Sequence, residues 1–304
     1  MKKVFISTTT FAQEDPSILQ GLAKAGIMYT LNLHQRRLNE AEITEILVKG
    51  GYIGLLAGLE PLTKSVLTQA KNLKVISRVG VGIDNVDVLA AKKFGIKVYN
   101  TPGVLTDTVA ELTLGLMLAA LRKISLQDRQ MHQGSWDKKM GALLKGKTVG
   151  IVGFGQIGMR VADLALAFGA KIILTDLRKI KKAKTKQVGL AQLIKSADII
   201  SLHCSGKDCV LGDKEINAAK QGVIIVNTAR GQLIDEAALL NGLSSGKIAS
   251  AALDVFEQEP YQGELCKHEH VILTPHIGSY AKEARIMMEK DAVANLIKGL
   301  MGKS

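Results

Sequence analysis

Residues 146–176 read GKTVGIVGFGQIGMRVADLALAFGAKIILTD, and this stretch decides the fold. An apolar segment leads into a glycine-rich turn at residues 153–158. An alanine- and leucine-rich segment follows, and then a second apolar segment that ends before Asp176. Strand, turn, helix and strand in this order are typical of one half of a doubly wound α/β domain.

Each glycine of the turn has a separate expected role. Gly153 permits the tight turn, Gly155 lets the backbone approach a pyrophosphate, and Gly158 lets the helix pack closely on the strand. The pyrophosphate would lie at the N-terminal end of the helix, where unpaired N–H groups carry about half a positive charge. A glycine-rich turn of another α/β protein is the alternative, which the flanking strands disfavour. The residues expected to bind a dinucleotide are Gly153, Phe154, Gly155, Gln156, Ile157 and Gly158.

The acid after the second strand indicates which dinucleotide binds. Asp176 should accept hydrogen bonds from the adenosine ribose hydroxyls, and a carboxylate there repels a 2′-phosphate. We therefore expect NAD rather than NADP as the cofactor. A basic run close behind could nevertheless hold a phosphate, which keeps NADP as the alternative: Arg178, Lys179, Lys181, Lys182, Lys184 and Lys186.

Apolar strand-like segments alternate with helix-like segments along the whole chain. This alternation predicts mostly parallel sheets with helices on both faces. The continuously apolar strands are consistent with burial on both sides. The expected strands are residues 4–7, 73–77, 97–99, 148–152, 171–175, 199–202, 222–226, 250–255 and 271–273, and the expected helices are residues 16–25, 110–123, 235–243 and 281–300.

Length, composition and charge narrow the class of protein. The 304 residues suggest two domains if each has about 150 residues. No apolar stretch is long enough to span a membrane, and the apolar run near the start is too short for a signal peptide. The net charge of +12 would suit a nucleic-acid partner, but the basic run has no interleaved aromatic residues. A solvated basic surface is therefore the preferred interpretation.

The cysteines and the histidines near them indicate the cellular compartment of the protein and whether it binds a metal. Cys204, Cys209 and Cys266 are odd in number and irregularly spaced, which argues against a disulfide framework and for a reducing cytoplasm. Cys266, His268 and His270 fit no zinc spacing. We expect a cytoplasmic protein with no metal, and we expect Cys204 to be a small packing residue.

Three short polar segments follow apolar strands later in the chain. They read VNTARG at residues 226–231, LDVFEQEP at residues 253–260 and LTPHIG at residues 273–278. Ligands bind beyond the carboxyl ends of parallel strands, so Arg230, Glu259 and His276 are expected to converge on one cleft.

These three residue types suit hydride transfer between a nicotinamide and a 2-oxo acid. The Arg230 guanidinium can hold the substrate carboxylate and polarise the carbonyl. The His276 imidazole can supply the proton of the new hydroxyl, and a Glu259 carboxylate beside it would fix its tautomer. Each residue alone could be an ordinary surface or loop residue, but their joint placement favours catalysis.

The motifs together resemble those of the D-isomer-specific 2-hydroxy acid dehydrogenases. GIVGFGQIG (150–158), NTARG (227–231), DVFEQEP (254–260) and TPHIG (274–278) are similar to the family's signature segments, as is RVGVGIDNVD (78–87). AGLEPLT (57–63) and NTPGV (100–104) are most similar to the phosphoglycerate dehydrogenase branch. The similarity covers almost the whole chain.

The resemblance implies a discontinuous architecture. Residues 1–99 plus 279–304 would form a smaller, flavodoxin-like α/β substrate-binding domain. Residues 100–278 would form an inserted NAD-binding domain with a Rossmann-type, doubly wound parallel sheet. Hinge closure would exclude water from the substrate. Family members are usually homodimers, here joined through the cofactor domain by the helix from Ala110 and the arm through Trp136.

The resemblance also assigns residues to the site. Arg230, Glu259 and His276 become the catalytic set. Further cofactor-binding residues are His203, Thr228, Ala229, Asp254 and Gly278. The substrate would be bound by Arg78, Val79, Gly80, Val81, Gly82, Asn100, Arg230 and His276, and Arg78 would either meet a phosphate or brace its domain.

Two departures from the family pattern stand out. Residues 202–207 read LHCSGK and lack the proline of the family's leucine-histidine-x-proline-leucine-threonine segment, which leaves cofactor contacts there open. The chain ends at Ser304, so we expect no serine-binding regulatory domain and no inhibition by serine.

The expected activity is NAD-dependent oxidation of 3-phosphoglycerate to 3-phosphohydroxypyruvate, as in serine biosynthesis. One alternative is a reductase for glyoxylate, hydroxypyruvate or a D-lactate-type substrate. Another is a non-catalytic, NAD-sensing protein of the corepressor type. The expected partner is in each case a small 2-hydroxy or 2-oxo acid, with no nucleic acid and no membrane.

Overall fold

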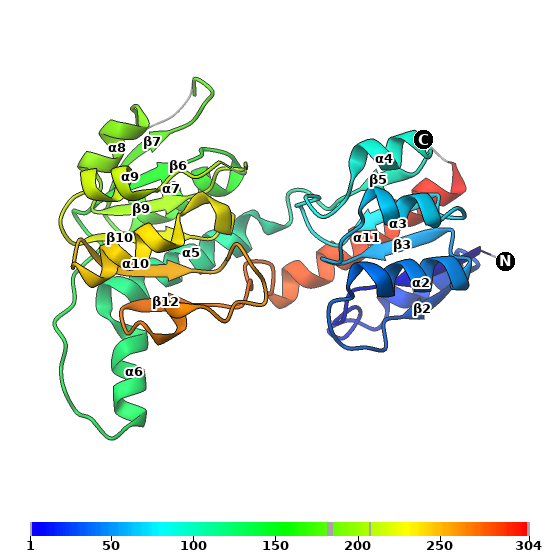
Figure 1. The fold of residues 1–304 in the computed structure, drawn as a ribbon, viewed down its shortest axis with the longest axis horizontal. Coiled ribbons are helices and arrows are strands. Elements are labelled where there is room, and N and C mark those ends of the chain that lie inside the picture. Colours follow the sequence, from blue (N-terminus) through cyan, green and yellow to red (C-terminus); the bar gives the residue numbers. More distant parts are fainter. Residues whose placement is uncertain (1, 181–184, 207, 303–304) are drawn as a thin grey trace. The chain divides into compact units, whose positions relative to one another are not determined.

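The computed structural model describes residues 2–180, 185–206 and 208–302. Lys181, Lys182 and Lys184 of the basic run and Lys207 of the altered loop lie outside these ranges. The chain forms two compact units, a smaller one with residues 1–105 and 279–304 and a larger one with residues 106–278 (Figure 1).

The larger unit contains a parallel seven-stranded sheet. Its strands are β6 (Thr148–Val152), β7 (Lys171–Thr175), β8 (Lys186–Gln187), β9 (Ile199–Leu202), β10 (Val223–Asn227), β11 (Ile248–Leu253) and β12 (Val271–Leu273). They are arranged in the order β12-β11-β10-β9-β6-β7-β8. The chain runs outward from β6 to β8 and then returns to β9 on the other side of β6. The strand order thus reverses between β6 and β9, which is where open α/β sheets bind ligands.

Helices cover both faces of this sheet, because alternate strand residues point to opposite sides. On β10, Val223 and Ile225 pack into one core cluster, while Ile224 and Val226 pack into another. The first cluster includes residues of α8 (Leu190–Ser196), α9 (Asp213–Ala218) and α10 (Glu236–Ser244); the second includes residues of α5 (Leu105–Arg122) and α7 (Gln156–Ala167). This arrangement confirms the expected doubly wound α/β fold.

Six neighbouring strands of the larger unit end in register. Thr175, Val152, Leu202, Asn227, Leu253 and Leu273 pair across the sheet, each with its neighbour. The residues that come next along the chain therefore form a row along the carboxyl edge of the sheet. That row is Asp176, Gly153, His203, Thr228, Asp254 and Thr274.

The smaller unit contains a parallel five-stranded sheet. Its strands are β1 (Lys2–Ile6), β2 (Ile27–Leu31), β3 (Gly54–Ala57), β4 (Val75–Arg78) and β5 (Lys97–Tyr99), in the order β2-β1-β3-β4-β5. This is the strand order of flavodoxin-like sheets. Its helices are α1 (Ile18–Lys24), α2 (Glu40–Gly50), α3 (Lys64–Gln69), α4 (Val88–Lys93) and α11 (Lys282–Met301).

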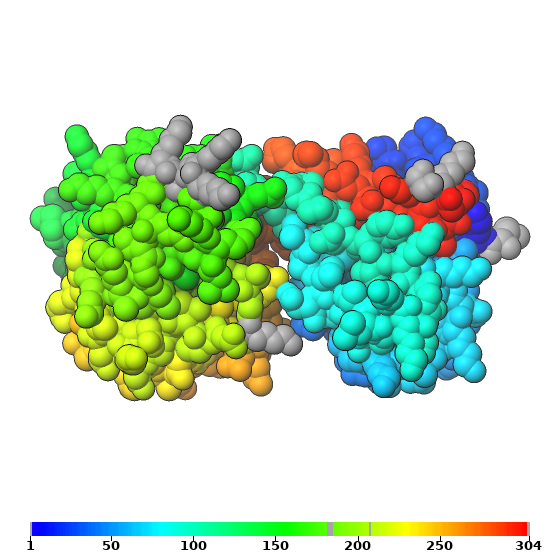
Figure 2. Space-filling view, turned by 90° about the horizontal axis from the view of Figure 1, so that it is seen from above, coloured from blue at the N-terminus to red at the C-terminus, as the bar shows by residue number. Residues whose placement is uncertain are grey.

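The C-terminal helix α11 completes the smaller unit. Met288 and Leu296 of α11 are fully buried against residues of α1, β1 and β4, in a cluster that includes Leu22, Val4 and Val75. Gly299 permits this close approach, since a Cβ there would lie 2.9 Å from Val75. The space-filling view shows the C-terminal segment in red beside the N-terminal segment in blue (Figure 2).

The boundary between the units lies a few residues later than expected from the sequence. Residues 100–105, expected in the cofactor domain, belong to the smaller unit. The reason is a set of tertiary contacts: Asn100 and Thr101 form hydrogen bonds with the loop after β4, and Val104 and Leu105 pack against the α11 cluster. None of the helices among the described residues is long and apolar enough to cross a membrane.

Candidate active site

The glycine turn leaves an open, uncapped helix end. Gly153 has φ +90°, and a Cβ on it would lie 2.5 Å from the backbone nitrogen of Cys204. A Cβ on Gly158 would overlap the carbonyl oxygen of Gly153, whereas a Cβ on Gly155 would meet no described atom within 4 Å. The residue before α7 is Gly155, which has no side chain to cap the helix. The first N–H groups of α7 and the space at Gly155 are thus suited to a pyrophosphate.

Asp176 lies directly beside this turn. Its Oδ2 accepts a hydrogen bond from the Phe154 N–H at 2.8 Å, and its Oδ1 accepts one from the Arg178 N–H at 2.8 Å. The Arg178 guanidinium also donates to both oxygens, with distances of 3.1 and 3.3 Å. The guanidinium, assisted by the two backbone donors, lowers the pKa of Asp176 to about 2. The carboxylate is therefore ionised, as the expected ribose acceptor must be.

His203 and Thr228 follow β9 and β10 in the row at the carboxyl edge of the sheet, beside the place where the strand order reverses. The His203 N–H donates to the Val152 carbonyl at 2.7 Å, and its ring Nε2 lies 2.8 Å from the Ser201 hydroxyl. Burial lowers the pKa of His203 to about 4, so its ring is neutral near pH 7. The Thr228 hydroxyl lies 2.9 Å from the hydroxyl of Thr113 on α5. Thr113 already donates its proton to the Val109 carbonyl, so Thr228 must be the donor between the two hydroxyls. The Thr228 oxygen is therefore left with acceptor capacity only for any further partner.

Arg230 follows β10 in a tightly held loop. The Asn227 side chain accepts from the Ala229 N–H at 3.0 Å and donates to the Arg230 carbonyl at 2.8 Å. The Arg230 guanidinium donates to the Ala229 carbonyl at 2.7 Å. A Cβ on Gly231 would overlap the backbone of Phe256, so the loop after β10 lies directly against the loop after β11.

Glu259 and His276 form a hydrogen-bonded pair across the next two loops. The Nδ1 atom of His276 lies 2.8 Å from Oε2 of Glu259. The other oxygen, Oε1, accepts a hydrogen bond from the Phe256 N–H at 3.1 Å. With Nδ1 held by the carboxylate, Nε2 is the ring atom left to exchange a proton with a substrate. This is the geometry that an acid/base histidine and an orienting carboxylate require.

Asp254 positions the turn that carries His276. It is 1% exposed, and its Oδ1 accepts from the Thr274 hydroxyl at 2.6 Å and the Ile277 N–H at 2.8 Å. Its Oδ2 accepts from the Gly278 N–H at 2.9 Å. Burial raises the pKa of Asp254, and these hydrogen bonds oppose the rise. His276 has φ +55°, an uncommon backbone conformation that Asp254 stabilises from both sides.

The expected substrate loop lies in the smaller unit, after β4. The Gly80 N–H donates to the Thr101 hydroxyl at 3.0 Å, and the Asn100 amide donates to the Val81 carbonyl at 2.8 Å. Gly80 has φ +144°, a conformation that favours glycine. These bonds hold residues 79–82 in an irregular turn at the carboxyl edge of this sheet.

Arg78 lies beneath this loop. It is 9% exposed, its guanidinium donates to the Val79 carbonyl, and a Cβ on Gly80 would lie 2.5 Å from its Nη1. The buried Glu60 accepts from the Ser7 hydroxyl at 2.6 Å, and burial raises its pKa against the opposing charge of Arg78. Of the two roles expected for Arg78, this environment favours bracing.

The structure thus brings the expected cofactor and catalytic residues to one edge of the larger sheet, and the other expected substrate residues to the edge of the smaller one. Sequence reasoning did not single out Thr101, Thr113, Asn227, Thr274 or Glu60, although each bonds to a predicted residue or lies beside one. Four of these residues occur within the quoted motifs, and this was the signal that could have identified them: Glu60, Thr101, Asn227 and Thr274. Thr113 carries none, since it looks like any residue of an apolar helix.

Similarity to known proteins decides the family. Residues 114–278 match the family model described as the NAD binding domain of D-isomer specific 2-hydroxyacid dehydrogenases. The chain belongs to this family. The 2-hydroxyacid dehydrogenase is 44% identical over 249 residues to a hydroxypyruvate reductase from Thermotoga maritima, which covers 79% of this chain and 81% of that protein.

Two further comparisons show how far the similarity extends. A D-3-phosphoglycerate dehydrogenase from Archaeoglobus fulgidus is 40% identical over 250 residues, covering 77% of this dehydrogenase but only 47% of the relative. The crystal structure of the TT0316 protein from Thermus thermophilus superimposes with a TM-score of 0.91 at 35% identity, over 99% of this chain and 98% of that one. The protein is an NAD-dependent oxidoreductase of the 2-hydroxyacid dehydrogenase family.

The carboxyl edge of the larger sheet suits the NAD that this dehydrogenase uses. The uncapped start of α7 would hold the pyrophosphate, Asp176 the adenosine ribose, and the acceptor oxygen of Thr228 a donor on the nicotinamide half. When bound, the cofactor supplies or accepts a hydride.

Proposed function

We propose that this dehydrogenase interconverts a short 2-oxo acid and its D-2-hydroxy acid, with hydroxypyruvate and glyoxylate as the leading substrates. The observation that carries the catalytic assignment is the 2.8 Å bond between His276 Nδ1 and Glu259 Oε2. A non-catalytic, NAD-sensing protein would not need this pair, so the pair supports an enzyme.

The proposed chemistry divides between three side chains. Arg230 pairs with the substrate carboxylate and draws electron density from the carbonyl that becomes the hydroxyl. As the carbonyl carbon gains a hydride, His276 gives a proton from Nε2 to the oxygen. Glu259 stabilises the positive imidazolium before that transfer, and in the oxidative direction each step runs in reverse.

The choice of substrate rests on Arg78. The sequence favoured 3-phosphoglycerate because residues 57–63 and 100–104 resemble the phosphoglycerate dehydrogenase branch and because Arg78 could meet the phosphate. The burial of Arg78 beneath the loop of residues 79–82 supports bracing, which removes the second of these reasons. The Thermotoga relative, named a hydroxypyruvate reductase, is also slightly more similar than the phosphoglycerate dehydrogenase from Archaeoglobus. Oxidation of 3-phosphoglycerate, as in serine biosynthesis, is therefore the second candidate.

A substrate panel tests the proposal. The specificity constant kcat/KM is measured with NADH for hydroxypyruvate, glyoxylate, pyruvate and 3-phosphohydroxypyruvate. We expect the first two to exceed the phosphorylated acid by at least about tenfold, since a few contacts decide such preferences. A preference for 3-phosphohydroxypyruvate would establish the second candidate. No turnover of any acid, with NADH binding retained, would favour an NAD sensor.

We also propose that the protein is a homodimer joined through the larger unit. Helix α6 (Ile124–His132) and the segment to residue 145 project as an arm from the body of this unit (Figure 1). The arm exposes large apolar side chains, with Trp136 76% and Met140 88% exposed. Such apolar groupings mark protein interfaces.

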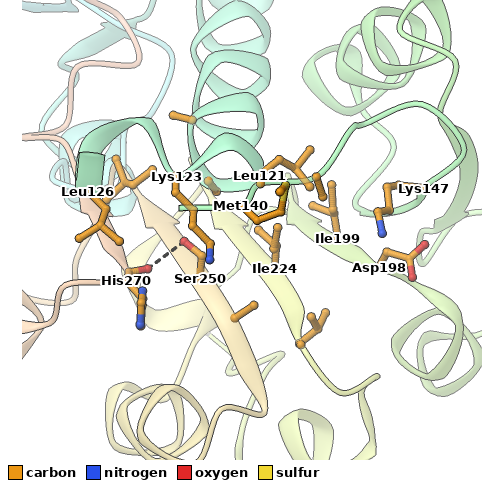
Figure 3. A pocket seen from close by; sticks show the side chains of 18 of the residues that line it. Leu121, Lys123, Leu126, Met140, Lys147, Asp198, Ile199, Ile224, Ser250 and His270 are labelled. Atoms are coloured by element: carbon orange, nitrogen blue, oxygen red, sulfur yellow. Dashed lines mark hydrogen bonds between the residues drawn. The ribbon is translucent and has the colours of Figure 1, made fainter. Parts of the chain in front are cut away.

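A cavity beside the arm supports the same assignment. Its volume is about 310 Å³, and it lies at the amino ends of β9 and β10, at the opposite edge of the sheet from the glycine turn. Leu126 of α6 and Met140 of the arm contribute to its lining (Figure 3). A second copy of the arm is the proposed occupant of this face.

We further propose that the protein works in a reducing cytoplasm, where its three cysteines would remain free thiols.

A further inference from the structure

The carboxylate of Asp176 is already saturated with hydrogen-bond donors. Four donors from the described part of the chain reach it: the Phe154 N–H, the Arg178 N–H, and the Nε and Nη2 atoms of the Arg178 guanidinium. A carboxylate offers about four lone-pair sites. Ribose hydroxyls can therefore bind Asp176 only if one of these donors leaves.

Of these donors, the guanidinium is the one free to leave. The Phe154 N–H belongs to the glycine turn, and the backbone around Arg178 is held by the Gln187 side chain. That side chain donates to the Asp176 carbonyl at 3.2 Å and to the Arg178 carbonyl at 2.9 Å, and it accepts from the Ile180 N–H at 3.0 Å. The Arg178 side chain, in contrast, is 71% exposed and can move into solvent, whereas the Asp176 side chain is 9% exposed and keeps its two backbone donors. Ribose hydroxyls that take the place of the guanidinium restore the lost hydrogen bonds to the carboxylate.

We propose that Arg178 determines cofactor specificity and makes this a site for both NAD and NADP. With NAD, the ribose hydroxyls replace the guanidinium on Asp176. With NADP, the displaced guanidinium stays beside the ribose, because its backbone is fixed, and binds the 2′-phosphate. The planar guanidinium is suited to a phosphate because it offers two parallel N–H donors. It also offsets the repulsion between Asp176 and the phosphate.

The adjacent residue provides a matched control. Lys179 is exposed and carries the same charge as Arg178, and Gln187 holds the backbone on both sides of it. General attraction of an anionic cofactor by the basic surface predicts similar effects from removing either charge. A direct role of the Arg178 guanidinium predicts an effect at Arg178 alone.

The test is binding rather than turnover. Dissociation constants for NADH and NADPH are measured by nucleotide fluorescence for the wild type, Arg178→Ala and Lys179→Ala. We expect the wild type to bind both cofactors within about tenfold of each other. In Arg178→Ala the ratio of the NADPH constant to the NADH constant should rise about tenfold to a hundredfold, because charge-assisted hydrogen bonds are lost while Asp176 becomes accessible.

The control variant should leave that ratio within about threefold of the wild type, as for a screened surface charge. An unchanged ratio in Arg178→Ala would overturn the proposal. So would an equal rise in Lys179→Ala, or wild-type binding of NADPH more than about a hundredfold weaker than that of NADH. Calorimetry checks that Arg178→Ala is folded at the temperature of the titration, and the ratio of the two dissociation constants is then read on the folded protein.

Discussion

His276 Nδ1 lies 2.8 Å from Glu259 Oε2, and this bond joins the loops that follow two neighbouring parallel strands. The bond assigns each nitrogen of the imidazole ring a separate task. Nδ1 is held by the carboxylate, and Nε2 is the nitrogen proposed to exchange a proton with the substrate. The geometry depends on Asp254, which bonds to the residues before and after His276.

Asp254→Asn should therefore reduce both stability and turnover. Asp254 accepts three hydrogen bonds from donors, and an amide in its place would point an N–H group at one of them. A buried unsatisfied donor costs about 1–3 kcal/mol in the free energy of unfolding. Urea unfolding and steady-state kinetics measure the two effects. Unchanged stability together with unchanged kcat would show that Asp254 does not hold the His276 turn.

Two glycines of the same turn should respond in opposite ways to alanine. Gly158→Ala places a methyl group against the Gly153 carbonyl and should destabilise the fold by about 1–3 kcal/mol. Gly155→Ala meets no described atom within 4 Å, so the fold should be unaffected. Its methyl group would instead occupy the expected pyrophosphate space and weaken NADH binding about tenfold or more. Calorimetry and fluorescence titration separate the two effects, and full NADH affinity in Gly155→Ala would contradict the assignment.

His203 should make the fold sensitive to mild acid. Burial lowers its pKa from 6.5 to about 4, so between these values the unfolded chain binds the proton and the folded chain does not. The contribution of the neutral His203 to the free energy of unfolding is thus fully present above pH 6.5. It falls as the pH drops, by about 3 kcal/mol near pH 4. His203→Gln should show a smaller loss over this window in thermal unfolding, and an equal loss in the two proteins would rule the explanation out.

The apolar arm should hold the proposed dimer together. Met140→Glu introduces a charge at a position that is 88% exposed in the monomer, so the monomer should keep its stability. In a dimer the same charge would be buried without a partner, which should weaken association by several kcal/mol. Analytical ultracentrifugation should find a wild-type dimer and a variant monomer. A wild-type monomer at micromolar concentration would exclude the dimer.

Much of this organisation could be predicted from the sequence because it depends on local patterns. The glycine turn, the apolar strands and the three polar segments specify where each chain segment lies on a parallel sheet. The register of β10, β11 and β12 then brings Arg230, Glu259 and His276 to the same edge. Two strands of the smaller unit were not predicted. β2 is half exposed and lacks the continuous apolar run of a buried strand. β3 is fully buried, but its four residues include Gly54, and a glycine weakens a strand pattern.

Side-chain orientation was beyond the reach of the sequence. Arg78 reads equally well as a phosphate ligand or a brace, and only its burial under Gly80 favours the second. Arg178 reads as one member of a basic run, and nothing in that run shows that its guanidinium bonds to Asp176. Residues 100–105 join the smaller unit through hydrogen bonds to a loop about twenty residues earlier, which no local pattern encodes.

The proton transfer by His276 is the central claim, and single-turnover kinetics test it most directly. Enzyme with bound NADH is mixed with the best 2-oxo acid, and the loss of NADH absorbance is followed in the wild type and in His276→Ala. The variant should react about 10²–10⁴-fold more slowly, because general acid catalysis is lost, while binding NADH as tightly as the wild type. A variant that oxidises its NADH at the wild-type rate would contradict the account.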